Sequence, residues 1–139
     1  MIAEHLLQSS LRQLFLHLQR LARAEPLRDV CVYSIERDGE EIVHVESIHL
    51  AWGEDDQRAE MTLEAEGGAV EVWRPAGPRS DHIQRPLDFI VEEDGYRVAG
   101  GRFETAHHAA TALVELFQVA VGVAEGSEPP TEWTAARSG

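Results

Sequence analysis

The sequence predicts an α+β domain: a mostly antiparallel sheet of about six strands, with an N-terminal and a C-terminal helix packed on one face. Apolar residues recur at helical spacing near both ends of the chain, and at a spacing of two between turn residues in the middle. The length of 139 residues suits one domain. We expect that domain to span residues 1–126 and a polar tail to span residues 127–139.

Residues 4–24 are expected to form an amphipathic helix that ends before Pro26. Its apolar stripe consists of Leu7, Leu11, Leu14, Leu18 and Leu21. This spacing suits a helix that faces the core, and it also suits a coiled-coil seam joining two copies of the chain. Only about two heptads are present, fewer than a coiled coil needs. The core-facing helix is therefore preferred, with a homodimer through residues 4–24 as the alternative.

A meander of four strands is expected between residues 30 and 73, with turns at Asp38-Gly39-Glu40, at 53–57 and at Gly67-Gly68. The third strand alternates most clearly, because Ala59, Met61, Leu63 and Ala65 interleave with Glu60, Thr62, Glu64 and Glu66. One face of this strand should therefore meet the core while the other carries carboxylates into water. Cys31 is expected to lie within the apolar first strand.

The second half of the chain is expected to begin with an irregular surface loop over residues 74–86, because this stretch holds three prolines and a glycine. A hairpin of 89–91 and 96–98 follows around Asp94-Gly95, and Gly100-Gly101 marks a bulge or a bend. Thr105 should cap a helix that ends at Gly122 or Gly126. The predicted core consists of Leu11, Leu14, Leu18, Leu63, Val72, Val91, Leu113 and Phe117.

Charge and motifs exclude several classes of function. The chain has 25 acidic and 12 basic residues and a formal net charge of −13, so a nucleic acid is a poor partner. The seven histidines do not form the ligand sets that a metal needs, and we expect neither a metal nor another cofactor. No nucleophile elbow or phosphate-binding loop is present, so we expect no catalytic residues and no enzyme. Without a signal peptide or an apolar span, we expect a cytoplasmic protein with no membrane contact.

The clustered acids are the most distinctive feature that remains. Such residues can be a solvated face, but they can also attract a basic partner and occupy sites that normally take phosphates. Tryptophan is enriched among the residues that dominate binding energies, and it is also common in cores. The predicted partner-binding residues are Trp52, Glu54, Asp55, Asp56, Glu60, Glu64, Glu66 and Trp73.

Residues 102–133, RFETAHHAATALVELFQVAVGVAEGSEPPTEW, resemble a bacterial immunity-protein family that protects cells against polymorphic toxins, including nucleic-acid deaminases. The shared pattern is a strand, a capped amphipathic helix with a Phe, and then a Pro and a Trp. The residues that fit it are Thr105, Ala109, Ala110, Leu113, Phe117, Pro129, Pro130 and Trp133. The resemblance implies an inhibitor that binds a basic cognate toxin and occludes its active site.

Two other classes stay open at this point. A small acidic secretion chaperone would have a similar size and charge, and would act as a dimer on a segment of a secreted effector. Its solution mass would show a stable dimer, whereas an immunity protein is commonly a monomer before it meets its toxin. A small enzyme or ligand-binding domain would need a concave apolar pocket, which a sequence does not reveal.

Overall fold

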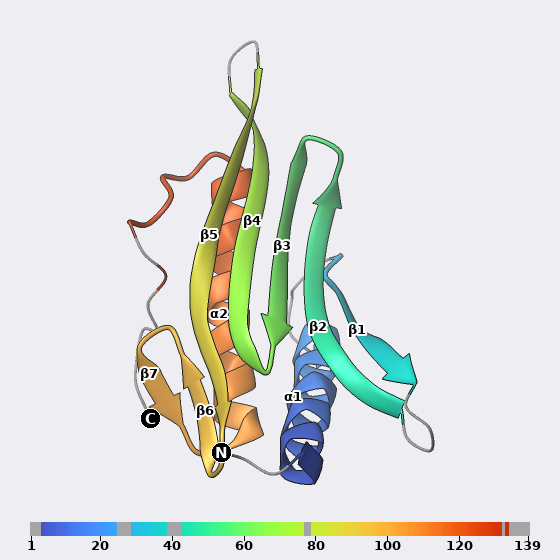
Figure 1. Ribbon diagram of the computed structural model, residues 1–139. Coiled ribbons are helices and arrows are strands. Elements are labelled where there is room, and N and C mark those ends of the chain that lie inside the picture. The colour runs from blue at the N-terminus through green and yellow to red at the C-terminus, as the bar shows by residue number, and fades with distance from the viewer. Residues whose placement is uncertain (1–3, 25–28, 39–42, 77–78, 132, 134–139) are drawn as a thin grey trace.

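The computed structural model describes residues 4–24, 29–38, 43–76, 79–131 and 133. Its elements follow one another as α1 (Glu4–Ala24), β1 (Cys31–Asp38), β2 (Val43–Glu54), β3 (Gln57–Glu64), β4 (Glu66–Ala76), β5 (Arg79–Glu92), β6 (Gly95–Val98), β7 (Gly101–Phe103) and α2 (Ala106–Ala124). The seven strands form one antiparallel sheet in the order of the chain, from β1 at one edge to β7 at the other (Figure 1). The fold is therefore the predicted α+β class, with one strand more than the sequence indicated.

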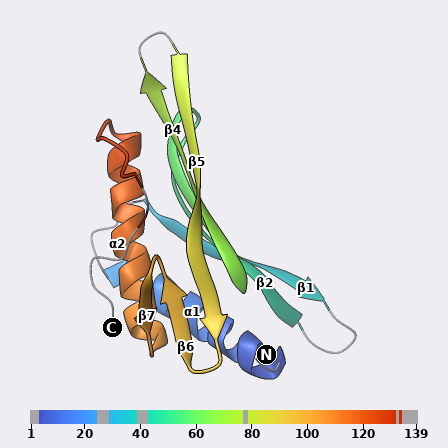
Figure 2. The ribbon, with the colours of Figure 1, turned by 60° about the vertical axis from the view of Figure 1, so that its left-hand side comes forward.

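Both helices lie on the same face of the sheet, and they contact each other there (Figure 2). α1 packs against β1 and β2, whereas α2 packs against β3, β4, β6 and β7. The core fills the space between the helices and the sheet, and every residue of the predicted core is buried in it. This arrangement leaves the opposite face of the sheet without a helix in the described part of the chain.

The leucine stripe of α1 faces this core. Leu11, Leu14 and Leu18 are at most 1% exposed, so the preferred reading of the stripe as a core face is confirmed. The far side of α1 exposes Leu6 and Leu16 instead. α2 begins as predicted, because the Thr105 hydroxyl accepts a hydrogen bond from the His108 backbone N–H at 3.1 Å.

The prediction of an irregular loop over residues 74–86 was wrong. Residues 74–76 and 79–86 belong to the paired strands β4 and β5, in which Arg74 lies opposite Asp81 and Ala69 lies opposite Pro86. Proline is tolerated here because β5 pairs with β6 only from Phe89 onward, so that Pro86 has a strand neighbour on one side alone. Gly100, with φ of +85°, belongs to the turn that leads into the additional strand β7.

Cys31 lies in the first strand as expected, but it is exposed. It opens β1, an edge strand, and lies opposite Ala51. The apolar residues of β1 alternate between a half-buried side toward α1 and an exposed side away from it. A short apolar run does not reveal that its strand lies at an edge.

The described part of the segment 127–139 packs against the domain. The Arg85 guanidinium donates hydrogen bonds to the carbonyl oxygens of Pro130 and Thr131, and Arg74 donates one to the Ser127 carbonyl at 3.0 Å. Trp133 is 7% exposed and belongs to the core. These contacts lie on the side of β4 and β5 that faces α2.

α2 meets the length and hydropathy of a membrane-spanning helix, which the sequence analysis did not anticipate. Its apolar residues include Leu113, Leu116 and Phe117, all of which are buried in this fold. A helix in the core of a domain meets the same criterion.

Candidate interaction face

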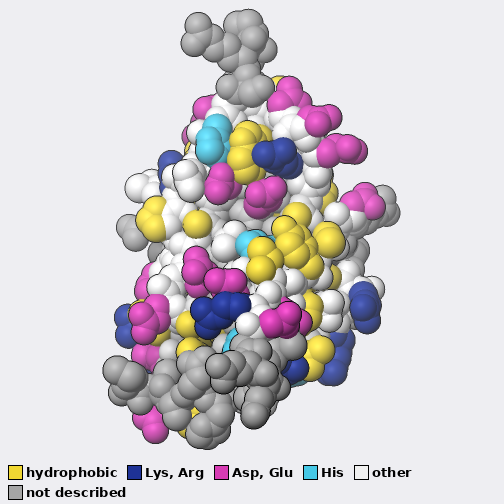
Figure 3. Space-filling model, turned by 45° about the vertical axis from the view of Figure 1, so that its right-hand side comes forward, with side chains coloured by type: hydrophobic (Ala, Val, Ile, Leu, Met, Phe, Trp, Pro, Cys, Tyr) yellow, Lys and Arg dark blue, Asp and Glu magenta, His cyan; other side chains and the backbone are white. Residues whose placement is uncertain are grey.

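The face of the sheet turned away from the helices is called the uncovered face below. Side chains alternate along each strand, so the pairing registers assign every second residue to this face. On β1 to β5 it carries Cys31, Tyr33, Ile35, Ser47, His49, Ala51, Arg58, Glu60, Thr62, Glu64, Ala69, Glu71, Trp73, His82, Gln84, Pro86, Asp88, Ile90 and Glu92. Figure 3 views the molecule obliquely toward this face and shows hydrophobic, histidine and acidic side chains gathered on it.

A three-residue stack lies at one end of the uncovered face. The Trp73 indole is held between the Arg58 guanidinium, 3.9 Å from the ring centroid, and the His82 imidazole, whose centroid is 4.6 Å away at an interplanar angle of 11°. The three residues are direct cross-strand neighbours on β3, β4 and β5. The stack fixes a large aromatic ring on the surface, which reduces the entropy lost when a partner packs against it.

Two carboxylates hold this stack from below. Glu71 Oε2 lies 3.0 Å from His82 Nε2, and Glu71 Oε1 accepts a hydrogen bond from Gln84 at 3.4 Å. Glu60 Oε1 lies 3.7 Å from Arg58 Nε. Because these groups are partly exposed, the ion pairs add little to stability, but they set the orientation of the side chains.

The centre of the uncovered face carries no Asp, Glu, Lys or Arg side chain among the described residues. The rings of Tyr33 and His49 stack with centroids 5.0 Å apart and an interplanar angle of 12°. The two ring nitrogens of His49 lie 2.7 Å from the Ser47 hydroxyl and 3.3 Å from the Thr62 hydroxyl, which fixes the ring flat on the sheet. Tyr33 is 44% exposed, and Ile35, two residues further along β1, is 46% exposed.

Carboxylates border this aromatic centre on two sides. Glu60 and Glu71 lie one register step above the row of His49 and Thr62, while Glu64 and Asp88 lie one step below it. The interaction face is therefore an aromatic and apolar centre with an acidic rim. An apolar centre with a polar rim is typical of protein interfaces, and the sign of this rim favours a basic partner.

The β2–β3 hairpin adds an acidic tip at the end that carries the Trp73 stack. Glu54, Asp55 and Asp56 are all exposed there, and Asp55 adopts a left-handed φ of 57°. Gly53, with φ of +79°, allows the close turn, because an added Cβ would lie 2.3 Å from the Gln57 carbonyl oxygen. The register Gly53–Arg58–Trp73 places this tip directly beyond the stack.

The structure divides the predicted partner-binding residues into three groups. Glu60, Glu64 and Trp73 lie on the uncovered face, and the acidic tip adjoins it. Glu66 is exposed at the start of β4, opposite Ile90. Trp52 lies opposite Ala59 on the helix-covered face and packs against the core, so the two tryptophans that the sequence analysis grouped together point to opposite sides of the sheet.

Sequence reasoning missed several contributors to this face, among them Tyr33, Ile35, His49, Arg58, Glu71, His82 and Asp88. The alternation along β3 contained a usable signal, because Arg58 precedes Glu60 by two residues. The partners on neighbouring strands depend on register, which the sequence of one strand does not provide.

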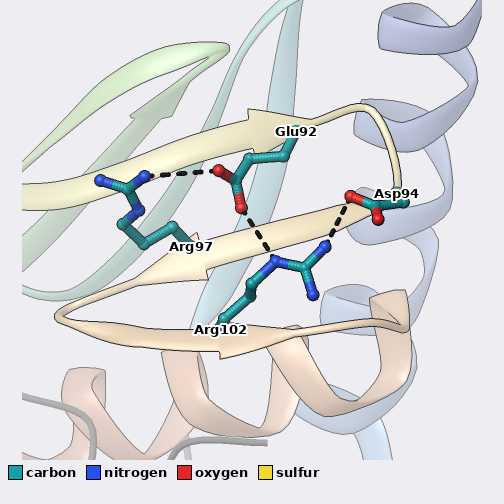
Figure 4. A network of polar contacts seen from close by, with 4 residues as sticks. All are labelled: Glu92, Asp94, Arg97 and Arg102. Atoms are coloured by element: carbon teal, nitrogen blue, oxygen red, sulfur yellow. Dashed lines mark hydrogen bonds and ion pairs between the residues drawn. The ribbon is translucent and has the colours of Figure 1, made fainter.

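Acidic and basic side chains pair at the lower end of the sheet. Glu92 pairs with Arg97 and Arg102 at 3.4 Å each, and Arg102 also donates to Asp94 at 2.5 Å (Figure 4). The hydrogen bond to Asp94 raises the pKa of Arg102. These pairs neutralise much of the acid on the β5–β6 hairpin, so the acidic character belongs to the upper and middle parts of the uncovered face.

A separate hollow of about 420 Å³ lies between α1, the β5–β6 turn and the start of α2. His17 and His107 line it with ring centroids 5.8 Å apart, and burial, followed by the charges of Arg20 and His107, lowers the pKa of His17. The Tyr96 hydroxyl donates to the Ser10 carbonyl at 2.7 Å, and burial raises the pKa of Tyr96. Within the described residues, no group of three or more His, Cys, Asp or Glu side chains is placed to hold a metal ion.

No protein-family model matches the chain, and neither a curated protein nor a solved structure is significantly similar to it.

Proposed function

We propose that this protein is an immunity-type inhibitor, which binds a basic cognate toxin through the uncovered face and the acidic tip and thereby occludes the active site of the toxin. The observation that carries the proposal is the acid-rimmed aromatic centre on a sheet face that no described helix covers. An active site that binds phosphates is positively charged. A rigid acidic surface can occupy such a site and speed association through its field.

The resemblance of residues 102–133 to immunity proteins supports the same proposal, although these residues are not expected to contact the toxin. Thr105 caps α2, while Leu113, Phe117 and Trp133 are buried in the core. They would maintain the fold, and the uncovered face would provide the contact. The test therefore uses residues of the uncovered face.

The experiment asks whether a gene beside this one encodes a toxin domain, and whether this protein neutralises that domain. Co-expression should restore growth of cells that produce the toxin, and the purified proteins should form a complex. Trp73→Ala should weaken that complex by about tenfold or more, since it removes a large preorganised aromatic ring. Trp52→Phe, on the covered face, serves as the control and should have little effect. The absence of a neighbouring toxin gene, or neutralisation that is unaffected by Trp73→Ala, would contradict the proposal.

A secretion chaperone is the second candidate function. Its dimer was expected to form through the leucine stripe of residues 4–24, but Leu11, Leu14 and Leu18 lie inside the core. The chaperone hypothesis would have to use the exposed Leu6 and Leu16 instead. A stable dimer of the protein alone, measured by sedimentation, would favour this candidate.

A further inference from the structure

The edge strand β1 borders the acid-rimmed face and shares Tyr33 and Ile35 with it, but its outer backbone edge does not belong to that face. It is the first strand of the sheet order, so β2 is its sole strand neighbour among the described residues. Such an edge presents backbone N–H and C=O groups that can pair with another extended chain.

Proteins usually protect these edges with charges or bulges. Here the bulge between Ile35 and Glu36 and the charged residues 36–38 protect one half of β1. The half from Cys31 to Ile35 has no charged residue.

The two sides of this unprotected half differ in chemistry. Away from the helices, Tyr33 and Ile35 expose apolar surface beside the edge. Toward the helices, α1 runs beneath β1 and reaches it, because Gln19 Nε2 donates to the Val32 carbonyl at 3.5 Å. A hollow of about 400 Å³ lies on α1, lined by Leu16, Gln19, Arg20 and Arg23. A smaller hollow continues it from Gln19 and Arg23 to Val30 and Val32 of the β1 region.

The described charges of α1, which lies on this side, are opposite in sign to the net charge of the chain. The charged side chains described on α1 are Arg12, Arg20 and Arg23, all exposed, in a protein of net charge −13. Arg20 and Arg23 stand at the hollow that leads to the β1 edge. A strand added beside β1 would alternate its side chains between the apolar side and these arginines.

We propose that the edge from Cys31 to Ile35 is a second docking site, which takes an extended acidic segment of a partner protein as an additional strand of the sheet. Apolar side chains of that segment would contact Tyr33 and Ile35, while its carboxylates would face Arg20 and Arg23. Backbone hydrogen bonds supply affinity in this mode of recognition, and the alternating side chains supply specificity. The site shares Tyr33 and Ile35 with the interaction face, but its backbone edge and its arginines lie outside that face, and it has the opposite charge preference.

Charge complementarity argues against a second copy of this chain as the occupant. Pairing of β1 with its own copy about a twofold axis would bring the two α1 helices, with their arginines, to the same side of the joined sheet. Each copy also carries a net charge of −13. A partner segment that supplies carboxylates to Arg20 and Arg23 avoids the repulsion between the arginines of two α1 helices.

The test uses synthetic peptides with the full-length protein. A fluorescein-labelled Val-Glu repeat of eight residues is titrated with protein and followed by fluorescence anisotropy, beside a Val-Lys repeat of equal length. We expect the Val-Glu peptide to bind about tenfold tighter or more at low salt, since its carboxylates face arginines and lysines would be repelled. Alternate N-methylation of the Val-Glu peptide should abolish binding, because it removes the backbone donors that pair with β1.

Paired variants locate the binding site on the protein. Arg20→Gln with Arg23→Gln should weaken Val-Glu binding by about fivefold or more, whereas Arg97→Gln with Arg102→Gln removes the same charge from the far end of the sheet and should change it less than about twofold. Equal weakening by both pairs would overturn the proposal, as would undiminished binding of the N-methylated peptide.

Sedimentation of the protein alone should show a monomer. A dimer that Ile35→Lys dissociates would show that a second copy occupies the edge, and would also overturn the proposal.

Discussion

Trp133 provides a quantitative test of whether the C-terminal segment belongs to the folded domain. Burying an indole removes about 150–250 Å² from water, which at about 25 cal/mol per Å² stabilises the fold by about 4–6 kcal/mol. Trp133 is 7% exposed, so most of this gain applies. Its Nε1–H is buried without a hydrogen-bond partner among the described residues, which costs about 1–3 kcal/mol. Trp133→Ala should therefore lower the free energy of unfolding by about 3 kcal/mol, within bounds of about 1–5 kcal/mol.

Trp133→Phe separates the two contributions. Phenylalanine keeps most of the apolar contact and removes the unpartnered N–H, so its cost should stay within about 1 kcal/mol. Urea denaturation followed by far-ultraviolet circular dichroism measures both values. The reasoning would be refuted if Trp133→Ala cost less than about 1 kcal/mol, because a segment that is not part of the fold would show that result. It would also be refuted if the two variants lost equal stability.

Two further predictions concern local structure. The lowered pKa of His17 means that the unfolded chain binds more protons than the folded chain as the pH falls past the ordinary value of 6.5. Stability should therefore decrease from about pH 7 down to the lowered pKa and then level off, and His17→Gln should flatten this part of a plot of unfolding free energy against pH. Gly53→Ala should destabilise the β2–β3 hairpin by about 1–3 kcal/mol, because the added Cβ meets the Gln57 carbonyl in a left-handed conformation. Urea denaturation checks this, and an unchanged midpoint would contradict the role given to Gly53.

The fold was predictable from the sequence where a regular spacing of apolar residues extended over a whole element. The leucines of α1 and the alternation of Ala59, Met61 and Leu63 each identify an element and its buried face. The β4–β5 hairpin was missed because Pro75 and Pro86 indicate a loop when read locally. Proline is acceptable in a strand where one side has no neighbour, and such positions become known only when the sheet is assembled.

The candidate site was predictable only in part, for a related reason. The acids were visible as a cluster, but the face on which each side chain lies depends on the register between strands. Trp52 and Trp73 illustrate this, because both follow strand-like runs and yet lie on opposite faces. The stack of Tyr33 on His49 joins β1 and β2. A β-bulge after Ile35 shifts the register between these two strands, and the sequence of either strand alone does not reveal that bulge.

The central claim is that the uncovered face, rather than the overall negative charge, attracts the partner. It is tested most directly by association rates with the neighbouring toxin domain, measured by stopped-flow fluorescence for two variants of equal charge change. Glu64→Arg with Asp88→Arg alters two exposed acids of the uncovered face, and Glu115→Arg with Glu125→Arg alters two exposed acids of the α2 region. The account predicts that the first pair slows association about tenfold or more and reduces its salt dependence, while the second pair changes the rate less than about threefold. Equal slowing by both pairs, or no slowing by the first, would contradict it.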